Sequence, residues 1–228
     1  FFGIIDKFFH QPKILKYLLK NLKDLNLFID IGSHKGTYTD LILKNFNVKK
    51  IYMFEPQKKI FRFIKKKYKR KNYIKIFNNA VSDNEKIQKI FINKHDLTSS
   101  LTKLDKKNTY LNLKARLFGG NIHDMISATH MIKCIKLINL IKKNKIKNID
   151  LLKIDTEGHE LQVMKGLGRY IKSVKYILIE FHNSNIYINY DSKKIHSYLT
   201  KNNFNLKEKF KFPFTTWEDR IYLNAKYQ

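Results

Sequence analysis

Cysteine is almost absent from this sequence: Cys134 is the only one in 228 residues. A lone thiol excludes an intrachain disulfide and a zinc site built from cysteines. It also indicates a reducing compartment, which predicts a cytoplasmic protein. Proline and glycine are scarce too, at three and eight residues, so long disordered linkers are not expected. No apolar run approaches the ~18–20 residues of a membrane span, which predicts no transmembrane segment.

Acidic residues are also few: 19 Asp and Glu stand against 46 Lys and Arg, a formal net charge of +27. One interpretation is an anionic partner, such as nucleic acid, an acidic lipid surface or a phosphorylated substrate. The other is compositional, because the lysines accompany abundant Asn, Ile, Phe and Tyr and are scattered along helical patterns such as residues 58–71. The scatter favours the compositional interpretation. Under either one, weak and salt-sensitive binding to polyanions is expected.

The first 25 residues are expected to form a helical extension, ahead of a domain that spans residues 26–228. They do not resemble a signal peptide, because Asp6, Lys7 and His10 interrupt the apolar stretch and no small-residue cleavage site follows. Since the sequence does not begin with Met, a fragment of a longer chain is one expectation. An apolar helical face either packs on the domain, which is the favoured interpretation, or lies on a membrane surface. Its members are Phe1, Ile4, Ile5, Phe8 and Phe9.

Short apolar runs alternate with helical patterns along the rest of the chain. This order predicts an α/β fold, a doubly wound and mostly parallel sheet that ends in an antiparallel C-terminal strand pair. A ligand is then expected beyond the carboxyl ends of the strands, at the point where the strand order reverses. Residues 94–131 are the least readable part. Strands are expected at 27–31, 50–56, 73–78, 87–93, 149–155, 174–182, 204–212 and 220–226, and helices at 11–25, 37–46, 57–68, 135–144, 159–171 and 192–203.

The stretch FIDIGSHKGTYT, residues 28–39, predicts a buried strand that leads through a glycine turn into a helix. Gly32 and Gly36 lack the Cβ atoms that would keep a ligand from the backbone N–H groups. Glu55 ends the next strand, near the ~20-residue offset at which an acid accepts hydrogen bonds from ribose hydroxyls. The pair indicates a nucleoside-containing cofactor. GSHKG lacks the middle glycine of GxGxxG, which argues against NAD.

Five segments occur in an order that resembles the FkbM family of S-adenosylmethionine-dependent methyltransferases, within the class I Rossmann-like fold. They are FIDIGSHKGTYT, IYMFEP, NNAVSD, LLKIDTEGHELQVMKGL and ILIEFH, and the resemblance covers about residues 26–182. It implies that Asp30, Gly32, Ser33 and Gly36 bind the methionine part of the donor, that Glu55 binds the ribose, and that Ser82 and Asp83 lie near the adenine. A rim of carboxylates also suits the sulfonium cation of that donor.

Acids gather at the most specific of these segments, where Asp155 ends a strand and Glu157 and Glu160 follow it. Acids there stabilise a helix start by about 0.3–1 kcal/mol, but three within six residues exceed that need. They are expected either to orient an acceptor hydroxyl or to help hold a divalent metal ion, and the sequence leaves this open. With Asp155 and Glu157, His182 is a candidate catalytic residue, as the base that takes the acceptor's proton. Lys153 shares the strand face of Asp155. A base or a phosphate contact is one interpretation, but a lysine that extends to solvent is the favoured one.

The predicted function is therefore methyl transfer, with a hydroxyl of a sugar, glycan or small metabolite as the acceptor that the resemblance implies. Two alternatives stay open. The net charge favours an RNA or another polyanion as the acceptor, and a departure from the family pattern favours a non-catalytic nucleoside-binding protein. The departure is KLINLI, in which Ile138 and Asn139 stand where relatives carry acids.

Overall fold

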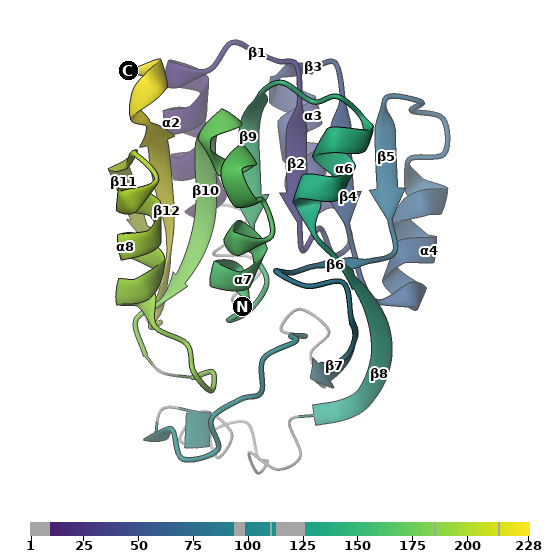
Figure 1. Ribbon diagram of the computed structural model, residues 1–228, viewed down its shortest axis with the longest axis vertical. Helices are drawn as coiled ribbons and strands as arrows, with labels where there is room; N and C mark the ends of the chain where they lie inside the picture. The colour runs from purple at the N-terminus through teal and green to yellow at the C-terminus, as the bar shows by residue number, and fades with distance from the viewer. Residues whose placement is uncertain (1–9, 94–98, 110, 113–125, 185, 214) are drawn as a thin grey trace.

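A computed structural model describes residues 10–93, 99–109, 111–112, 126–184, 186–213 and 215–228. Its centre is a seven-stranded sheet in the order β11-β12-β10-β9-β2-β4-β5 (Figure 1). Neighbouring strands run parallel except around β12, which is antiparallel to both β10 and β11. This confirms the predicted doubly wound sheet and its antiparallel C-terminal pair. The strands are β2 Phe28–Ile31, β4 Ile51–Phe54, β5 Ile74–Phe77, β9 Ile149–Ile154, β10 Val174–His182, β11 Phe204–Lys211 and β12 Trp217–Asn224.

Helices cover both faces of this sheet (Figure 1). One face carries α2 Gln11–Asn21, α3 Thr37–Asn45 and α4 Lys58–Lys67. The other carries α6 Leu137–Lys143, α7 Glu160–Lys165 and α8 Ser192–Lys201, with the 3₁₀ segment η4 Gly168–Ser173 after α7. Parallel strands that are covered on both faces must be apolar on both, which explains the short continuous apolar runs of the sequence.

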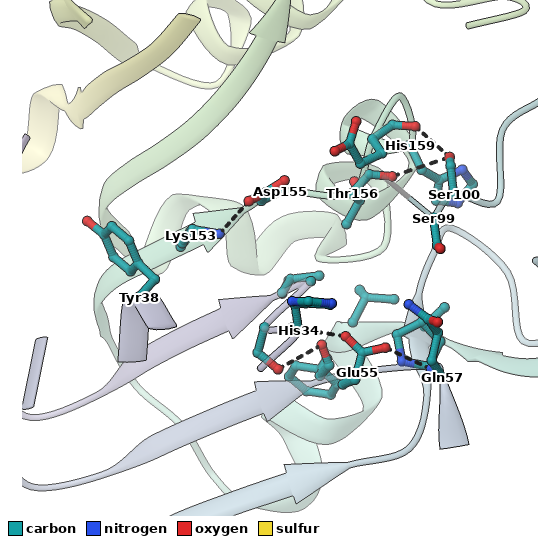
Figure 2. A pocket seen from close by; sticks show the side chains of 18 of the residues that line it. His34, Tyr38, Glu55, Gln57, Ser99, Ser100, Lys153, Asp155, Thr156 and His159 are labelled. Atoms are coloured by element: carbon teal, nitrogen blue, oxygen red, sulfur yellow. Dashed lines mark hydrogen bonds and ion pairs between the residues drawn. The ribbon is translucent and has the colours of Figure 1, made fainter. Parts of the chain in front are cut away.

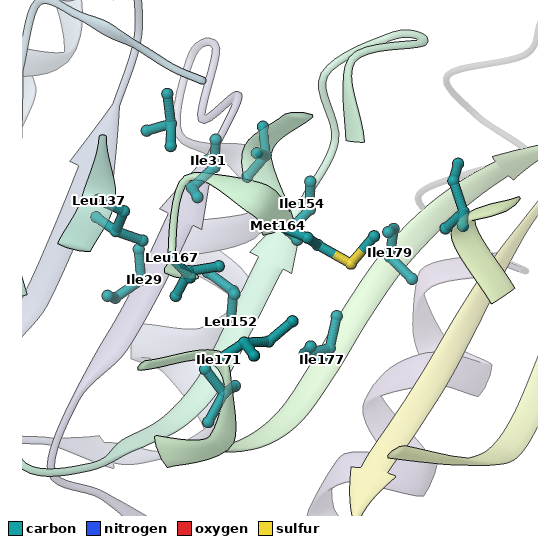
Figure 3. Packing of buried hydrophobic residues seen from close by; sticks show 14 of the residues in the cluster. Ile29, Ile31, Leu137, Leu152, Ile154, Met164, Leu167, Ile171, Ile177 and Ile179 are labelled. Atoms are coloured by element: carbon teal, nitrogen blue, oxygen red, sulfur yellow. The ribbon is translucent and has the colours of Figure 1, made fainter. Parts of the chain in front are cut away.

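Alternate residues of each strand enter two different hydrophobic clusters. Ile29, Leu152 and Ile177 pack with Leu137 of α6 and Met164 of α7 (Figure 3). The residues between them face α2, α3 and α4. Burial of one such side chain contributes about 1.5–3 kcal/mol, so the two clusters together fix the strand register and the position of every strand end.

A smaller sheet of three strands lies outside the central one, in the order β6-β8-β7. Its strands are β6 Ala80–Val81, β7 Ile87–Asn93 and β8 Ile126–Ile135. The sequence predicted β7 but not β8, because half of the residues of β8 are exposed and its apolar pattern is weak. A ten-residue strand therefore begins within the stretch treated as unreadable and extends beyond it.

Two predicted helices are shorter than expected. The one expected over residues 11–25 ends at Asn21, since Asp24–Leu25 form strand β1, which pairs with β3 Asn47–Val48. The one expected over residues 159–171 is divided into α7 and η4. Gly168, the first residue of η4, has a φ of +53°, in the left-handed region that interrupts an α-helix.

The N-terminal helix α2 packs directly on the sheet. Ile14 and Leu18 are fully buried in the same cluster as residues of β2, β9 and β10. His10, just before the helix, contacts Asp219 of β12 at 2.8 Å. The predicted apolar stripe of residues 1–9 lies outside the described residues, and the domain boundary at residue 25 stays a prediction. Among the described helices, none has both the length and the apolar character needed to cross a membrane.

Candidate active site

A cavity of about 790 Å³ opens at the carboxyl ends of β2, β4 and β9. This is the switch point of the sheet, where β4 flanks β2 on one side and β9, from much later in the chain, flanks it on the other. The volume lies within the ~300–1,000 Å³ typical of small-molecule sites. The walls include residues 32–34, 55–57, 79–81, 153 and 155–157.

The glycine turn after β2 is dictated by packing as well as by access to the cavity. Gly32 has a φ of +80°, and a Cβ there would lie 1.7 Å from the backbone oxygen of Asp155. Gly36, with a φ of +76°, is the residue before α3, and its Cβ would lie 2.5 Å from the hydroxyl of Tyr68. The sequence attributed both glycines to ligand approach. The structure adds that only glycine lets the ends of β2 and β9 come this close.

Glu55 lies in the wall of the cavity, just after β4, and is 3% exposed. Its carboxylate accepts backbone N–H bonds from His34 at 2.9 Å and from Gln57 at 2.8 Å, which hold both oxygens in place (Figure 2). Burial raises the pKa of Glu55 to about 7, although the two N–H bonds favour the ionised form. A fixed carboxylate whose oxygens keep further lone pairs is suited to accept hydrogen bonds from two vicinal hydroxyls.

Ser82 and Asp83, which were predicted to contact the donor, lie behind the wall of the cavity. The described lining includes Val81 but neither Ser82 nor Asp83. Ser82 is fully buried, and its Oγ lies 3.0 Å from Nε2 of His159, which does line the cavity. Burial lowers the pKa of His159 to about 4, so its ring is neutral at pH 7. The assignment of Ser82 and Asp83 to the adenine stays a prediction.

Asp30 is also set back from the cavity and reaches it through Lys153. It is fully buried on β2, and Thr39 donates to it at 2.7 Å. Lys153 stands opposite on β9, with Nζ 3.8 Å from Asp30 Oδ1. The same Nζ lies 2.8 Å from Asp155 Oδ2 (Figure 2). Burial disfavours the ammonium, but Asp155 and Asp30 outweigh it and raise the pKa of Lys153. In turn, Lys153 outweighs burial at Asp155 and lowers the pKa of that carboxyl.

A second polar group adjoins the cavity on the β10 side. Nε2 of His182 lies 3.4 Å from Oε2 of Glu180 and 3.8 Å from Oε2 of Glu157, and Tyr187 donates its hydroxyl to Glu157. Burial, and after it the neighbouring carboxylates, raise the pKa of both Glu157 and Glu180. The described lining of the cavity includes Glu157 but not Glu180 or His182. His182 therefore lies one side chain behind the wall.

Glu160, the third acid after Asp155 and Glu157, forms hydrogen bonds with the turn that precedes it. Its Oε1 accepts hydrogen bonds from Thr156 N at 3.2 Å, Thr156 Oγ1 at 3.0 Å and Gly158 N at 3.0 Å. Glu157 itself has a φ of +55°, an unfavourable conformation for a residue with a side chain. The turn that Glu160 stabilises thus holds Glu157 at the edge of the cavity.

Sequence reasoning undervalued Lys153 and missed Tyr187. Lys153 does not extend to solvent; it is 7% exposed and joins two acids. The available signal was strand alternation, which places Asp30, Lys153 and Glu180 on one face of the sheet at the ends of neighbouring strands. Tyr187 follows a loop whose geometry no periodicity predicts.

KLINLI, the segment that departs from the family pattern, lies away from the main cavity. Asn139 donates to Glu85 at 2.8 Å, in a separate hollow of about 410 Å³. Neither Ile138 nor Asn139 is among the described residues that line the main cavity. The absence of acids at these two positions therefore leaves the walls described above unchanged.

The strand order and the cavity at the switch point define a class I, Rossmann-like methyltransferase fold. The sequence profile of the methyltransferase FkbM domain matches residues 30–206, and the chain belongs to this family. It is 22% identical, over 174 residues, to the hexuronic acid methyltransferase AglP of Haloferax volcanii. The match covers 75% of this chain and 62% of AglP, so the chain spans less than two thirds of that relative.

Solved structures agree on the fold. The methyltransferase FkbM of Methylobacillus flagellatus superposes with a TM-score of 0.57 at 14% identity, covering 89% of this chain and 44% of that one. TrmK of M. capricolum, solved with S-adenosyl-homocysteine, gives 0.52 at 11% identity, covering 93% and 68%. Sp1610 of Streptococcus pneumoniae, a putative tRNA (m1A22) methyltransferase solved with S-adenosyl-L-methionine, gives 0.51 at 10% identity, covering 93% and 72%. At these identities the likeness concerns the fold alone.

Proposed function

We propose that the protein transfers the methyl group of S-adenosylmethionine to a hydroxyl oxygen of a sugar-type acceptor. The observation that carries this proposal is the cavity at the switch point, with Glu55 fixed on one side and Asp155 and Glu157 on the other. Membership of the FkbM family supports methyl transfer, and the similarity to AglP, a hexuronic acid methyltransferase, supports a hexuronic acid or a related sugar as the acceptor.

On the donor side, Glu55 binds the two ribose hydroxyls. The backbone N–H groups of Gly32 and Ser33 donate to Phe54 O and that of Gly36 donates to Ser33 O, so these residues shape the turn beside the methionine part. The carboxylate of that part lies near the start of α3, where the helix dipole favours a negative group. Asp30 acts on the donor indirectly, because its carboxylate balances the charge of Lys153. With the ribose and the methionine part bound at these places, the sulfonium of the donor lies close to the carboxylates of Asp155 and Glu157, which follow β9.

On the acceptor side, Asp155, Glu157 and His182 are the proposed catalytic group. The acceptor oxygen attacks the methyl carbon in line with the sulfur, the C–O bond forms while the C–S bond breaks, and the electron pair stays on the sulfur of S-adenosylhomocysteine. The hydroxyl proton passes to this group. Positioning of the two reactants supplies most of the rate in such a displacement.

The test is turnover with a panel of acceptors. Purified protein, S-adenosylmethionine and sugars with and without a 6-carboxylate are incubated, and S-adenosylhomocysteine and the methylated sugar are quantified together. The proposal predicts methyl ether formation on a hexuronic acid or a glycan that contains one. If donor is bound but no sugar accepts methyl, while a structured RNA does, the acceptor class is wrong.

The alternative of an RNA acceptor rests on the net charge of +27. A polyanion acceptor predicts lysines around the mouth of the cavity. Only two lysines are among its described lining residues, Lys44 and Lys153, and Lys153 is paired with Asp155. This placement favours the sugar acceptor.

A further inference from the structure

Three potential metal ligands converge beside the cavity. Glu157 comes from the turn after β9, and Glu180 and His182 come from the end of β10. One ligand atom from each lies within 4.8 Å of the other two. We infer that Glu157, Glu180 and His182 form a binding site for a divalent transition-metal ion.

The hydrogen bonding of this cluster is incomplete without a cation. His182 is 3% exposed, yet neither ring nitrogen has a hydrogen-bond partner within the described part of the chain. Oε2 of Glu180 is likewise buried and has no hydrogen-bond partner there, although His182 Nε2 lies 3.4 Å away. A buried polar atom without a hydrogen bond is unfavourable, because it has lost its contacts with water. A metal ion that bound Nε2 and the two carboxylates would remove this cost and offset their negative charge.

Two of the three spacings are close to those of direct coordination, and the third is within 4.8 Å. With metal–ligand bonds of ~2.1 Å, adjacent ligand atoms of a tetrahedral site lie about 3.4 Å apart. His182 Nε2 and Glu180 Oε2 are 3.4 Å apart, and His182 Nε2 and Glu157 Oε2 are 3.8 Å apart. One imidazole with two carboxylates suits Mn²⁺, Fe²⁺ or Zn²⁺ better than Ca²⁺ or Mg²⁺, which prefer oxygen ligands alone.

The surroundings hold the three ligands in place. Tyr187 donates its hydroxyl to Glu157, which is the type of outer contact that orients metal ligands. The rings of Tyr187 and Tyr190 meet the imidazole of His182 edge-on, with centroids 5.1 and 5.5 Å away. Because Glu157 also lines the cavity, an ion held here would adjoin the cavity.

The inference that the ion binds does not depend on methyl transfer, but the catalytic role given to the ion rests on the proposed function. In that reaction Glu157, Glu180 and His182 would hold the ion, which would supply Lewis-acid chemistry that lowers the pKa of the acceptor hydroxyl. Nε2 of His182 is then occupied by the metal, so Asp155 takes the proton. Under this assignment His182 is a ligand and not a free base.

The test is a titration of protein freed of metal by EDTA, with Mn²⁺ as the probe and the free ion measured by electron paramagnetic resonance. One Mn²⁺ per chain is expected. The isosteric variant Glu180→Gln and the variant His182→Gln are each expected to bind Mn²⁺ at least about tenfold more weakly, and Tyr187→Phe about tenfold. Glu208→Gln, which removes an exposed carboxylate of β11, is the matched control and leaves binding unchanged.

Circular dichroism of each variant establishes that it is folded. If His182→Gln fails to fold, the affinity of Glu180→Gln for Mn²⁺ decides whether the inference holds. The inference is overturned if wild type binds no Mn²⁺, or if Glu180→Gln binds it as tightly as wild type. Affinity for S-adenosylmethionine is measured in parallel: donor binding without metal binding leaves the proposed function standing, and metal binding without donor binding leaves the metal site standing.

Discussion

At the scale of single residues, the site consists of polar side chains placed by strand alternation. Asp30, Lys153 and Glu180 occupy one face of the sheet on three neighbouring strands, at the level where the hydrophobic clusters end. The sequence assigned Asp30 and Glu55 to one donor site and placed Asp155, at the end of a strand, among the candidate catalytic residues. It could not show that Asp30 stays behind Lys153, since that depends on how close β2 and β9 lie.

Donor binding is predicted to weaken in mild acid through Glu55. Burial raises its pKa to about 7, and ribose hydroxyls bind the ionised form. At pH 6 roughly a tenth of Glu55 is ionised, so the apparent affinity for S-adenosylmethionine should be about tenfold weaker than at pH 8. Calorimetric titrations at both pH values measure this, and Glu55→Gln should abolish the dependence. A wild-type affinity that is the same at both values would contradict the ribose assignment.

Lys153 is predicted to stabilise the fold by compensating the buried charge of Asp30. Lys153→Met leaves that carboxylate without its cation and should lower the free energy of unfolding by about 3–5 kcal/mol. The double variant Asp30→Asn/Lys153→Met should recover part of this loss, because the charge is then removed as well. Urea denaturation measures both. Additive losses in the double variant would show that the two residues do not interact.

At the scale of elements, prediction was most secure where burial is complete. Runs such as LFIDI and IDLLKID are apolar because helices cover both faces of the sheet, so their strands were readable. Of the partly buried strands, β7 and β11 were predicted, but half of the ten residues of β8 are exposed and its pattern carried little signal. The loops that complete the site, including the one with Tyr187, follow from tertiary contacts and have no periodicity.

The two glycines of the loop after β2 are predicted to differ in their tolerance of substitution. Both have a positive φ, which alone costs an alanine about 1–3 kcal/mol. At Gly36 the new methyl group meets the end of the Tyr68 side chain, which can move; at Gly32 it meets the backbone of Asp155. Gly32→Ala should therefore destabilise the protein more than Gly36→Ala in chemical denaturation. The opposite order would argue that β2 and β9 do not approach as described.

At the scale of the whole molecule, the excess of lysine is predicted to cause general and not specific binding of polyanions. The cavity lining contains few lysines, so no acceptor recognition is attributed to the net charge of +27. Fluorescence anisotropy should give similar affinities for unrelated RNA and DNA oligonucleotides, falling steeply between about 50 and 200 mM salt. A preference for one RNA that survives the higher salt would favour the RNA methyltransferase alternative.

The most direct test of the account is a crystal structure of the protein with S-adenosylhomocysteine. The account predicts that the ligand fills the cavity between β2, β4 and β9, with both ribose hydroxyls within hydrogen-bond distance of Glu55 and the sulfur directed toward Asp155 and Glu157. A ligand bound elsewhere, or a ribose that does not touch Glu55, would contradict it.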